Sequence, residues 1–156
     1  MTGSNDIRRP LRLIPAVQHY AWGKKGPSSL VARYGAVTDP DLPCAELWYG
    51  VHPNGVTKVE LPGGARPLSQ LLESQATAIL GGRVCAKFGR TLPFLLKIMS
   101  VAEPISIQAH PDRDWARKLH QQDARNYPDD NHKPEIAVAI GSLSMLSGFR
   151  PFAEIV

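Results

Sequence analysis

Three polar side chains of different chemistry are spaced two residues apart near the middle of the chain. Ser106, Gln108 and His110 alternate with Ile107 and Ala109 in the segment SIQAHP. Side chains on a strand alternate between its two faces, so a strand here would place the hydroxyl, the amide and the imidazole together. A barrel strand with one solvated face has the same pattern. The spacing alone is therefore consistent with either a solvent-exposed strand face or a functional site.

Two charged residues in apolar surroundings favour a site. Lys97 lies within FLLKIMS, where a buried ammonium group is costly unless it faces water or an anion. Glu46 would share a strand face with Trp48 and Gly50, and an inward carboxylate needs a partner such as a metal ion or a sugar hydroxyl. The alternative for Lys97 is an edge position from which its ammonium reaches solvent.

A divalent metal ion is one ligand that these residues could bind. Glu135 begins a predicted strand whose next same-face residues are the small Ala137 and Ala139, which leaves room beside the carboxylate. His and Glu are ordinary zinc ligands, and the Gln amide oxygen is a less common, uncharged donor. With Gln108, His110 and Glu135 as ligands, half of the ionic charge would remain to polarise a substrate oxygen. The Gln-x-His spacing is a weak motif by itself.

Most of the elements predicted to position these residues are short strands. The clearest is a hairpin over 44–61, in which two strand-like runs flank Asn54–Gly55. Further strands are expected near the start of 11–23 and over 92–101, 103–111, 134–141 and 144–149. The apolar run 92–101 is expected to be covered on both faces.

Helices are expected over 28–35, 67–74 and 112–122. Ser28 is the predicted N-cap of the first and Asp112 that of the last, which would pack Trp115 and Leu119. Because strands outnumber helices, the pattern favours an antiparallel β sandwich or barrel with a few short helices on its rim.

Composition narrows the possible partners. The chain has 156 residues and a formal net charge of +4, but its basic residues are scattered, which favours a small anion such as a phosphate ester over nucleic acid. Cys44 and Cys85 are too few for a disulfide framework. No apolar run approaches the length of a membrane span. We therefore expect a cytoplasmic protein without a nucleic-acid or membrane partner.

Four segments together resemble a type I phosphomannose isomerase: QHYAWG, ELWYGVHPNG, LPFLLKIMSVAEPISIQAHPD and NHKPEIAVA. Their order and spacing match the family from about Leu11 to Phe149, which is the N-terminal part of proteins more than twice this long. The resemblance implies a mainly β, cupin-like double-stranded β-helix (jelly roll) with a few peripheral helices. It predicts a disordered lead-in over 1–10, part of the zinc-binding catalytic domain over 11–150, and the start of a following segment over 151–156.

The resemblance also implies an activity and a metal. The family interconverts mannose 6-phosphate and fructose 6-phosphate, and one zinc ion per chain would be held by Gln108, His110 and Glu135. The family's fourth ligand is a histidine from its distal half, where a catalytic arginine also lies. None of the remaining histidines occupies that ligand position: His19, His52, His120 and His132.

The remaining roles are assigned to five residues. Lys133 and His132 are the candidates for the base that moves a proton through an enediol, and at most one of them should touch the substrate, because neighbours in an extended segment face opposite ways. Lys133 could instead contact a phosphate or a hydroxyl. Ser106, Lys97 and Glu46 are expected to bind the substrate, although Glu46 could orient a metal ligand instead.

Two other functions fit parts of the pattern. One is a non-catalytic cupin-like module that binds a sugar phosphate, which is consistent with the missing fourth ligand and arginine. The other is a metal-dependent oxygenase on the same fold, but Gln108 stands where a second histidine would be expected. We therefore favour the isomerase over the binding module, and both over the oxygenase.

Overall fold

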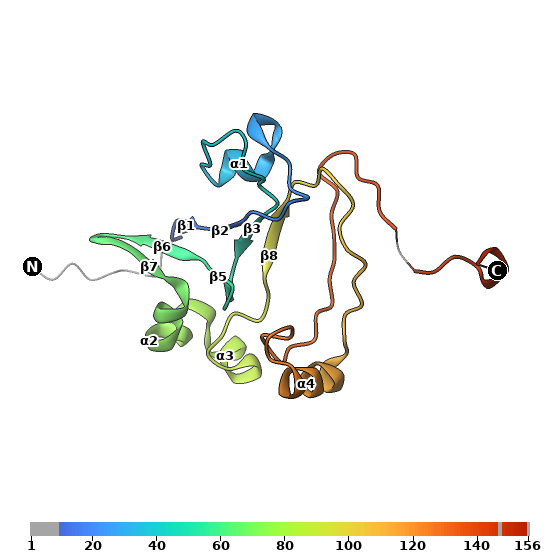
Figure 1. The fold of residues 1–156 in the computed structure, drawn as a ribbon. Coiled ribbons are helices and arrows are strands. Elements are labelled where there is room, and N and C mark those ends of the chain that lie inside the picture. Colours follow the sequence, from blue (N-terminus) through green and yellow to red (C-terminus); the bar gives the residue numbers. More distant parts are fainter. Residues whose placement is uncertain (1–9, 147, 156) are drawn as a thin grey trace, which may run out of the picture. The chain divides into compact units, whose positions relative to one another are not determined.

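A computed structural model describes residues 10–146 and 148–155, which form two compact units (Figure 1). The first unit ends at Ile107 and the second begins at Gln108, so the boundary falls inside the Ser106–His110 segment. The predicted lead-in lies outside the described residues except for Pro10. The predicted domain limits at 11, 150 and 151 remain predictions.

The described strands of the first unit form three small antiparallel sheets. The sheet that carries the candidate residues has the order β2–β3–β8, formed by Ala16–Gln18, Glu46–Tyr49 and Leu96–Met99. A second sheet has the order β1–β6–β7, formed by Leu13–Ile14, Lys58–Leu61 and Gly64–Pro67. The third is the hairpin of β4 (Val51–His52) and β5 (Gly55–Val56), which confirms the predicted hairpin but not its turn pair. His52 pairs with Gly55, so the turn residues are Pro53 and Asn54, and neither Asn54 nor Gly55 has the positive φ expected of the predicted turn. The fixed φ of proline suits the first central position of such a turn.

The described helices are short and mostly lie where the sequence predicts them. They are α1 (Leu30–Tyr34), α2 (Leu68–Leu80), α3 (Gly82–Phe88) and α4 (Arg113–Gln122), with 3₁₀ turns at Gly26–Ser28 and Phe152–Glu154. Within the described residues, no helix has the length and apolar character needed to cross a membrane.

One of the two predicted helix N-caps is confirmed and the other is wrong. The Asp112 carboxylate accepts the backbone N–H groups of Asp114 and Trp115, as expected for the N-cap of α4. Ser28 does not cap α1, because it ends the preceding 3₁₀ turn. The hydroxyl of Ser29 accepts the N–H of Ala32 instead. Helix α3 was not predicted at all.

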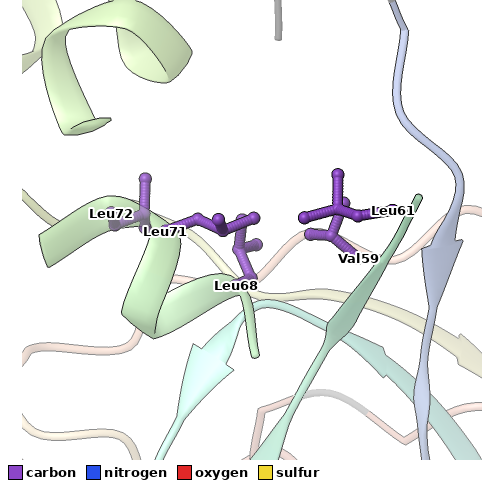
Figure 2. Packing of buried hydrophobic residues seen from close by; sticks show 5 residues of the cluster. All are labelled: Val59, Leu61, Leu68, Leu71 and Leu72. Atoms are coloured by element: carbon purple, nitrogen blue, oxygen red, sulfur yellow. The ribbon is translucent and has the colours of Figure 1, made fainter. Parts of the chain in front are cut away.

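Two groups of buried apolar side chains hold the first unit together. In one, Val59 and Leu61 of β6 face three leucines of α2 (Figure 2): Leu68, Leu71 and Leu72. In the other, the members are Val31, Ala32, Cys44 and Leu47. Burial raises the pKa of the Cys44 thiol above its ordinary value, with a further contribution from the Asp39 charge, so Cys44 is a structural residue rather than a nucleophile.

Leu71→Ala should lower the free energy of unfolding by about 2–5 kcal/mol, because Leu71 is almost fully buried and its loss leaves a cavity. Leu96→Ala is the matched control, since that leucine is largely exposed on β8 and should cost much less. Urea denaturation of both variants measures the difference. Equal losses would contradict this assignment of the core.

The apolar run around β8 is not covered on both faces as predicted. Phe94, Leu96 and Met99 are exposed, whereas Ile98 packs against the second core group. Among the described strands β8 pairs with β3 alone, so it forms one edge of its sheet. Leu96 and Met99 lie on opposite faces of the strand, so neither face is fully covered.

The strands predicted over 103–111 and 134–141 are absent, and the described part of 144–149 contains no strand either. Ser147 of that last range lies outside the described residues. The alternation is present in the sequence, but Ile136, Val138 and Ile140 are 93%, 81% and 79% exposed. A strand requires a neighbour to complete its backbone hydrogen bonds, and no described segment pairs with these residues.

Helix α4 also presents a different face from the one predicted. Ala116 is its buried residue, while Trp115 is exposed and carries the Lys118 ammonium 4.9 Å from its ring centroid. The expected packing of Trp115 is therefore wrong. A large exposed aromatic ring can be covered by a lysine stem without joining a core.

We expect the isolated 156-residue chain to be poorly soluble or partly unfolded, and inactive, because so much apolar surface of its second unit is exposed. Leu146 and Phe149 of that unit are almost completely accessible in addition to the three residues of 134–141. Size-exclusion chromatography and a thermal melt test this directly. A soluble monomer with one sharp, cooperative transition would contradict the expectation.

Candidate functional site

Two of the three predicted metal ligands lie next to each other in the second unit. The His110 Nε2 atom is 3.8 Å from the Glu135 Oε1 atom, although the two residues are far apart in the sequence. Both side chains are partly exposed and so accessible to an ion. Gln108 is exposed two residues before His110. The contact brings together an imidazole and a carboxylate, two side chains that can each be a zinc ligand.

The donor set fits zinc. Two ligand atoms about 2.0–2.1 Å from one tetrahedral zinc ion are roughly 3.3 Å apart, so the His110–Glu135 pair would need to close by only a few tenths of an ångström. Among the described residues, no group of three His, Cys, Asp or Glu side chains could hold a metal ion. Gln108, whose amide oxygen is the third predicted donor of this chain, is not one of these residue types.

Lys133, two residues before Glu135, forms an ion pair with Asp129. Its Nζ atom is 3.7 Å from the Asp129 Oδ2 atom. The neighbouring His132 is exposed. Asp129 was not among the residues singled out in the sequence, and because residues 129–133 are not helical, no regular spacing predicts this contact. The contact gives the Lys133 ammonium a defined partner within its own unit.

The first unit contains a second group of functional side chains, on β3 and β8. Trp48 and Lys97 are direct neighbours across the two strands. The Glu46 Oε2 atom accepts the Trp48 indole N–H at 2.5 Å and lies 3.7 Å from the Lys97 Nζ atom. Glu46 is only 5% exposed. The predicted common face of Glu46 and Trp48 is confirmed, and the partners of the carboxylate are an indole and an ammonium group.

Two aromatic neighbours of this group were missed in the sequence. Burial raises the pKa of the Tyr20 phenol above its ordinary value, and the negative charge of Glu46 raises it further. Tyr20 therefore remains a neutral hydroxyl, stacked on Trp22. The His52 ring meets the Trp48 ring edge-on at 5.0 Å. Tyr20 lies in the QHYAWG segment and His52 in the ELWYGVHPNG segment, but no residue spacing in the sequence indicates these contacts.

Ser106, the remaining predicted substrate contact, is exposed near the end of the first unit. The predicted site residues thus fall into two sets, one in each unit. Glu46, Lys97 and Ser106 belong to the first, and the set of the second is Gln108, His110, His132, Lys133 and Glu135.

Comparison with known proteins identifies the family. Residues 11–152 match the family described as phosphomannose isomerase type I, catalytic domain. The chain belongs to this family. Similar proteins of the family include the mannose-6-phosphate isomerase of Schizosaccharomyces pombe, which is 45% identical over 149 residues. The human mannose-6-phosphate isomerase is 48% identical over 148 residues.

Solved structures of phosphomannose isomerases agree with the fold. A mutant of phosphomannose isomerase from Salmonella typhimurium superposes with a TM-score of 0.66 at 36% identity, over 78% of this chain and 33% of that one. A mannose 6-phosphate isomerase from the same organism, bound to its substrate fructose 6-phosphate and to zinc, gives 0.64 at 35% identity, over 79% and 33%. The likeness confirms the predicted fold class, a mainly β, cupin-like architecture of which this chain contains a part.

The chain spans about a third of the length of the curated relatives. It covers 35% of both the S. pombe and the human protein, while those alignments include 92% and 90% of this chain.

Proposed function

We propose that this chain provides the metal-binding part of a zinc-dependent isomerase that interconverts mannose 6-phosphate and fructose 6-phosphate. The observation that carries the proposal is the 3.8 Å contact between His110 and Glu135, two expected ligands that are distant in sequence. The names of the relatives support the substrate, and the Salmonella structure with fructose 6-phosphate and zinc supports the metal.

Zinc held by Gln108, His110 and Glu135 would supply positive charge beside the sugar oxygens, where negative charge develops during isomerisation. The reaction moves a proton between the first two carbons through an enediol. Lys133 is our candidate for the group that transfers this proton, with His132 as the alternative. Lys133 is preferred because it lies two positions before Glu135, which puts both on one face of an extended segment.

Three residues of the first unit are our candidates for contacts to a sugar phosphate: Glu46, Lys97 and Ser106. The Lys97 ammonium is partly exposed and can contact the phosphate group, while Glu46 can accept a sugar hydroxyl or orient its neighbours. Ser106 adds a hydroxyl that can donate or accept. The ligand is a small sugar phosphate rather than nucleic acid or a membrane, and the free thiols of Cys44 and Cys85 are consistent with a cytoplasmic enzyme.

A proton NMR assay separates this function from its alternative, a cupin-like module that binds a sugar phosphate without converting it. The protein expressed from its complete reading frame is incubated with zinc and mannose 6-phosphate. An isomerase produces fructose 6-phosphate signals that grow with time, whereas a binding module only broadens or shifts the substrate signals. Saturable binding without product would therefore replace the proposed function with the alternative.

A further inference from the structure

One oxygen atom of the buried Glu46 carboxylate has two competing partners. The Trp48 indole N–H and the Lys97 ammonium both contact Oε2, the former at 2.5 Å and the latter at 3.7 Å. A direct N⁺–H···O⁻ hydrogen bond would be about 2.7–2.9 Å long. Lys97 is therefore close enough to neutralise Glu46 but is not hydrogen-bonded to it.

The Trp48 ring also positions the same ammonium group. Lys97 Nζ lies 5.2 Å from the centroid of the Trp48 ring, within the range of a cation–π interaction. Its side chain remains 31% exposed, so an anion can reach it.

The indole itself is held firmly. It is buried, and His52 meets its edge. Gly55 of the hairpin packs so closely that a Cβ atom there would lie 2.9 Å from the Trp48 ring and 2.6 Å from the Gln18 amide nitrogen. The indole N–H is consequently fixed toward Glu46, and the face of the ring is fixed under Lys97.

We infer that Trp48 is a positioning residue, whose indole N–H occupies the Glu46 oxygen and so keeps the Lys97 ammonium available to the phosphate group of a sugar phosphate. Without that N–H, the ammonium would move onto the carboxylate and form the shorter hydrogen bond. Lys97 would then have to break an ion pair before binding an anion. The inference rests on the proposed function for the identity of the ligand, but its geometry lies entirely within the first unit.

A double-mutant cycle tests the inference on the protein expressed from its complete reading frame. Trp48→Phe removes the N–H and retains an aromatic ring, and Glu46→Gln removes the charge that would capture Lys97. Calorimetry measures the Kd for inorganic phosphate and for fructose 6-phosphate in the wild type, both single variants and the double variant. Trp115→Phe on α4 is the matched control, because it makes the same chemical change at an exposed site.

Trp48→Phe should weaken binding of both probes by about tenfold when Glu46 is present, which is a typical size for coupling between contacting residues. The same substitution should change Kd less than about twofold in the Glu46→Gln background. Trp48→Phe should also raise KM for mannose 6-phosphate more than it lowers kcat. A purely structural role predicts equal losses in both backgrounds, and that result would overturn the inference, as would unchanged binding in Trp48→Phe.

A second measurement decides the question if Trp48→Phe does not fold. The Trp48 indole ¹H–¹⁵N resonance, assigned by triple-resonance NMR, should shift in Glu46→Gln and on titration with inorganic phosphate. An indole signal that responds to neither change would overturn the inference. Failure of the proposed function is a separate result, because a protein without isomerase activity can still show the predicted double-mutant coupling in its binding of inorganic phosphate.

Discussion

Replacing His110 with alanine should leave the protein without its zinc. The wild-type product of the complete reading frame is expected to retain about one zinc ion per chain after dialysis. His110 supplies the nitrogen that faces the Glu135 carboxylate, so its loss leaves one carboxylate and an uncharged amide among the ligands proposed for this chain. Loss of one zinc ligand lowers the affinity of the site for the metal, and elemental analysis after dialysis should find the variant nearly empty.

His120→Ala is the matched control for that measurement. Its imidazole lies in the same unit, on α4, but contacts the backbone carbonyl of Tyr127 rather than a carboxylate. This variant should retain the metal. A His110→Ala protein that is still fully loaded would show that the ligand assignment is wrong, whatever the activity of the variant.

Replacing Lys133 with alanine should reduce kcat by roughly 10²–10⁴-fold, the usual contribution of a general acid–base group, while zinc remains bound. The ammonium lies beside Asp129, and Lys133 is two positions before the proposed ligand Glu135. If Lys133 only holds the phosphate group, the loss should appear mainly as a higher KM. Steady-state kinetics on zinc-loaded variant protein distinguishes these two roles.

Lys118→Ala provides the control for the Lys133 experiment. Lys118 lies on α4 with its ammonium over the exposed Trp115 ring, and its loss should leave both kinetic constants near the wild-type values. Near-normal kcat and KM in Lys133→Ala would remove Lys133 from both proposed roles. His132 would then be the remaining candidate for the base.

Local chemistry in the sequence predicts several elements well. The turn-forming residues around Asn54 mark a hairpin whatever surrounds it, although the turn uses Pro53–Asn54 rather than Asn54–Gly55, and Asp112 can cap α4 with its own side chain. The common face of Glu46 and Trp48 follows from the two-residue period of a strand. Each of these features depends on a few neighbouring residues, which is why a single sequence is sufficient to predict them.

The failures concern features that depend on distant partners. Residues 134–141 have the alternation of a strand, but strand formation needs a paired neighbour, and none of the described segments provides one. The apolar run of β8 was expected to be covered on both faces, yet β8 is an edge strand with an exposed side. An apolar composition indicates what a strand can bury and does not say which segment covers it.

The candidate site also contains features that could be predicted from the sequence and features that could not. His110 and Glu135 were paired by resemblance to the type I enzymes, because the Gln-x-His spacing alone is weak, and the structure brings them to 3.8 Å. The shared Glu46 oxygen and the stacking of Tyr20 on Trp22 depend on side-chain geometry across strands and turns. No periodicity in the sequence indicates those contacts.

The most direct test of the account is a zinc titration of isomerase activity. The protein expressed from its complete reading frame is stripped of metal, supplied with increasing zinc, and assayed for conversion of mannose 6-phosphate to fructose 6-phosphate. We predict no activity without metal, a linear rise that ends at about one zinc ion per chain, and no rise in His110→Ala. A zinc-loaded protein that fails to convert the sugar phosphate, or full activity in the metal-free protein, would contradict the account.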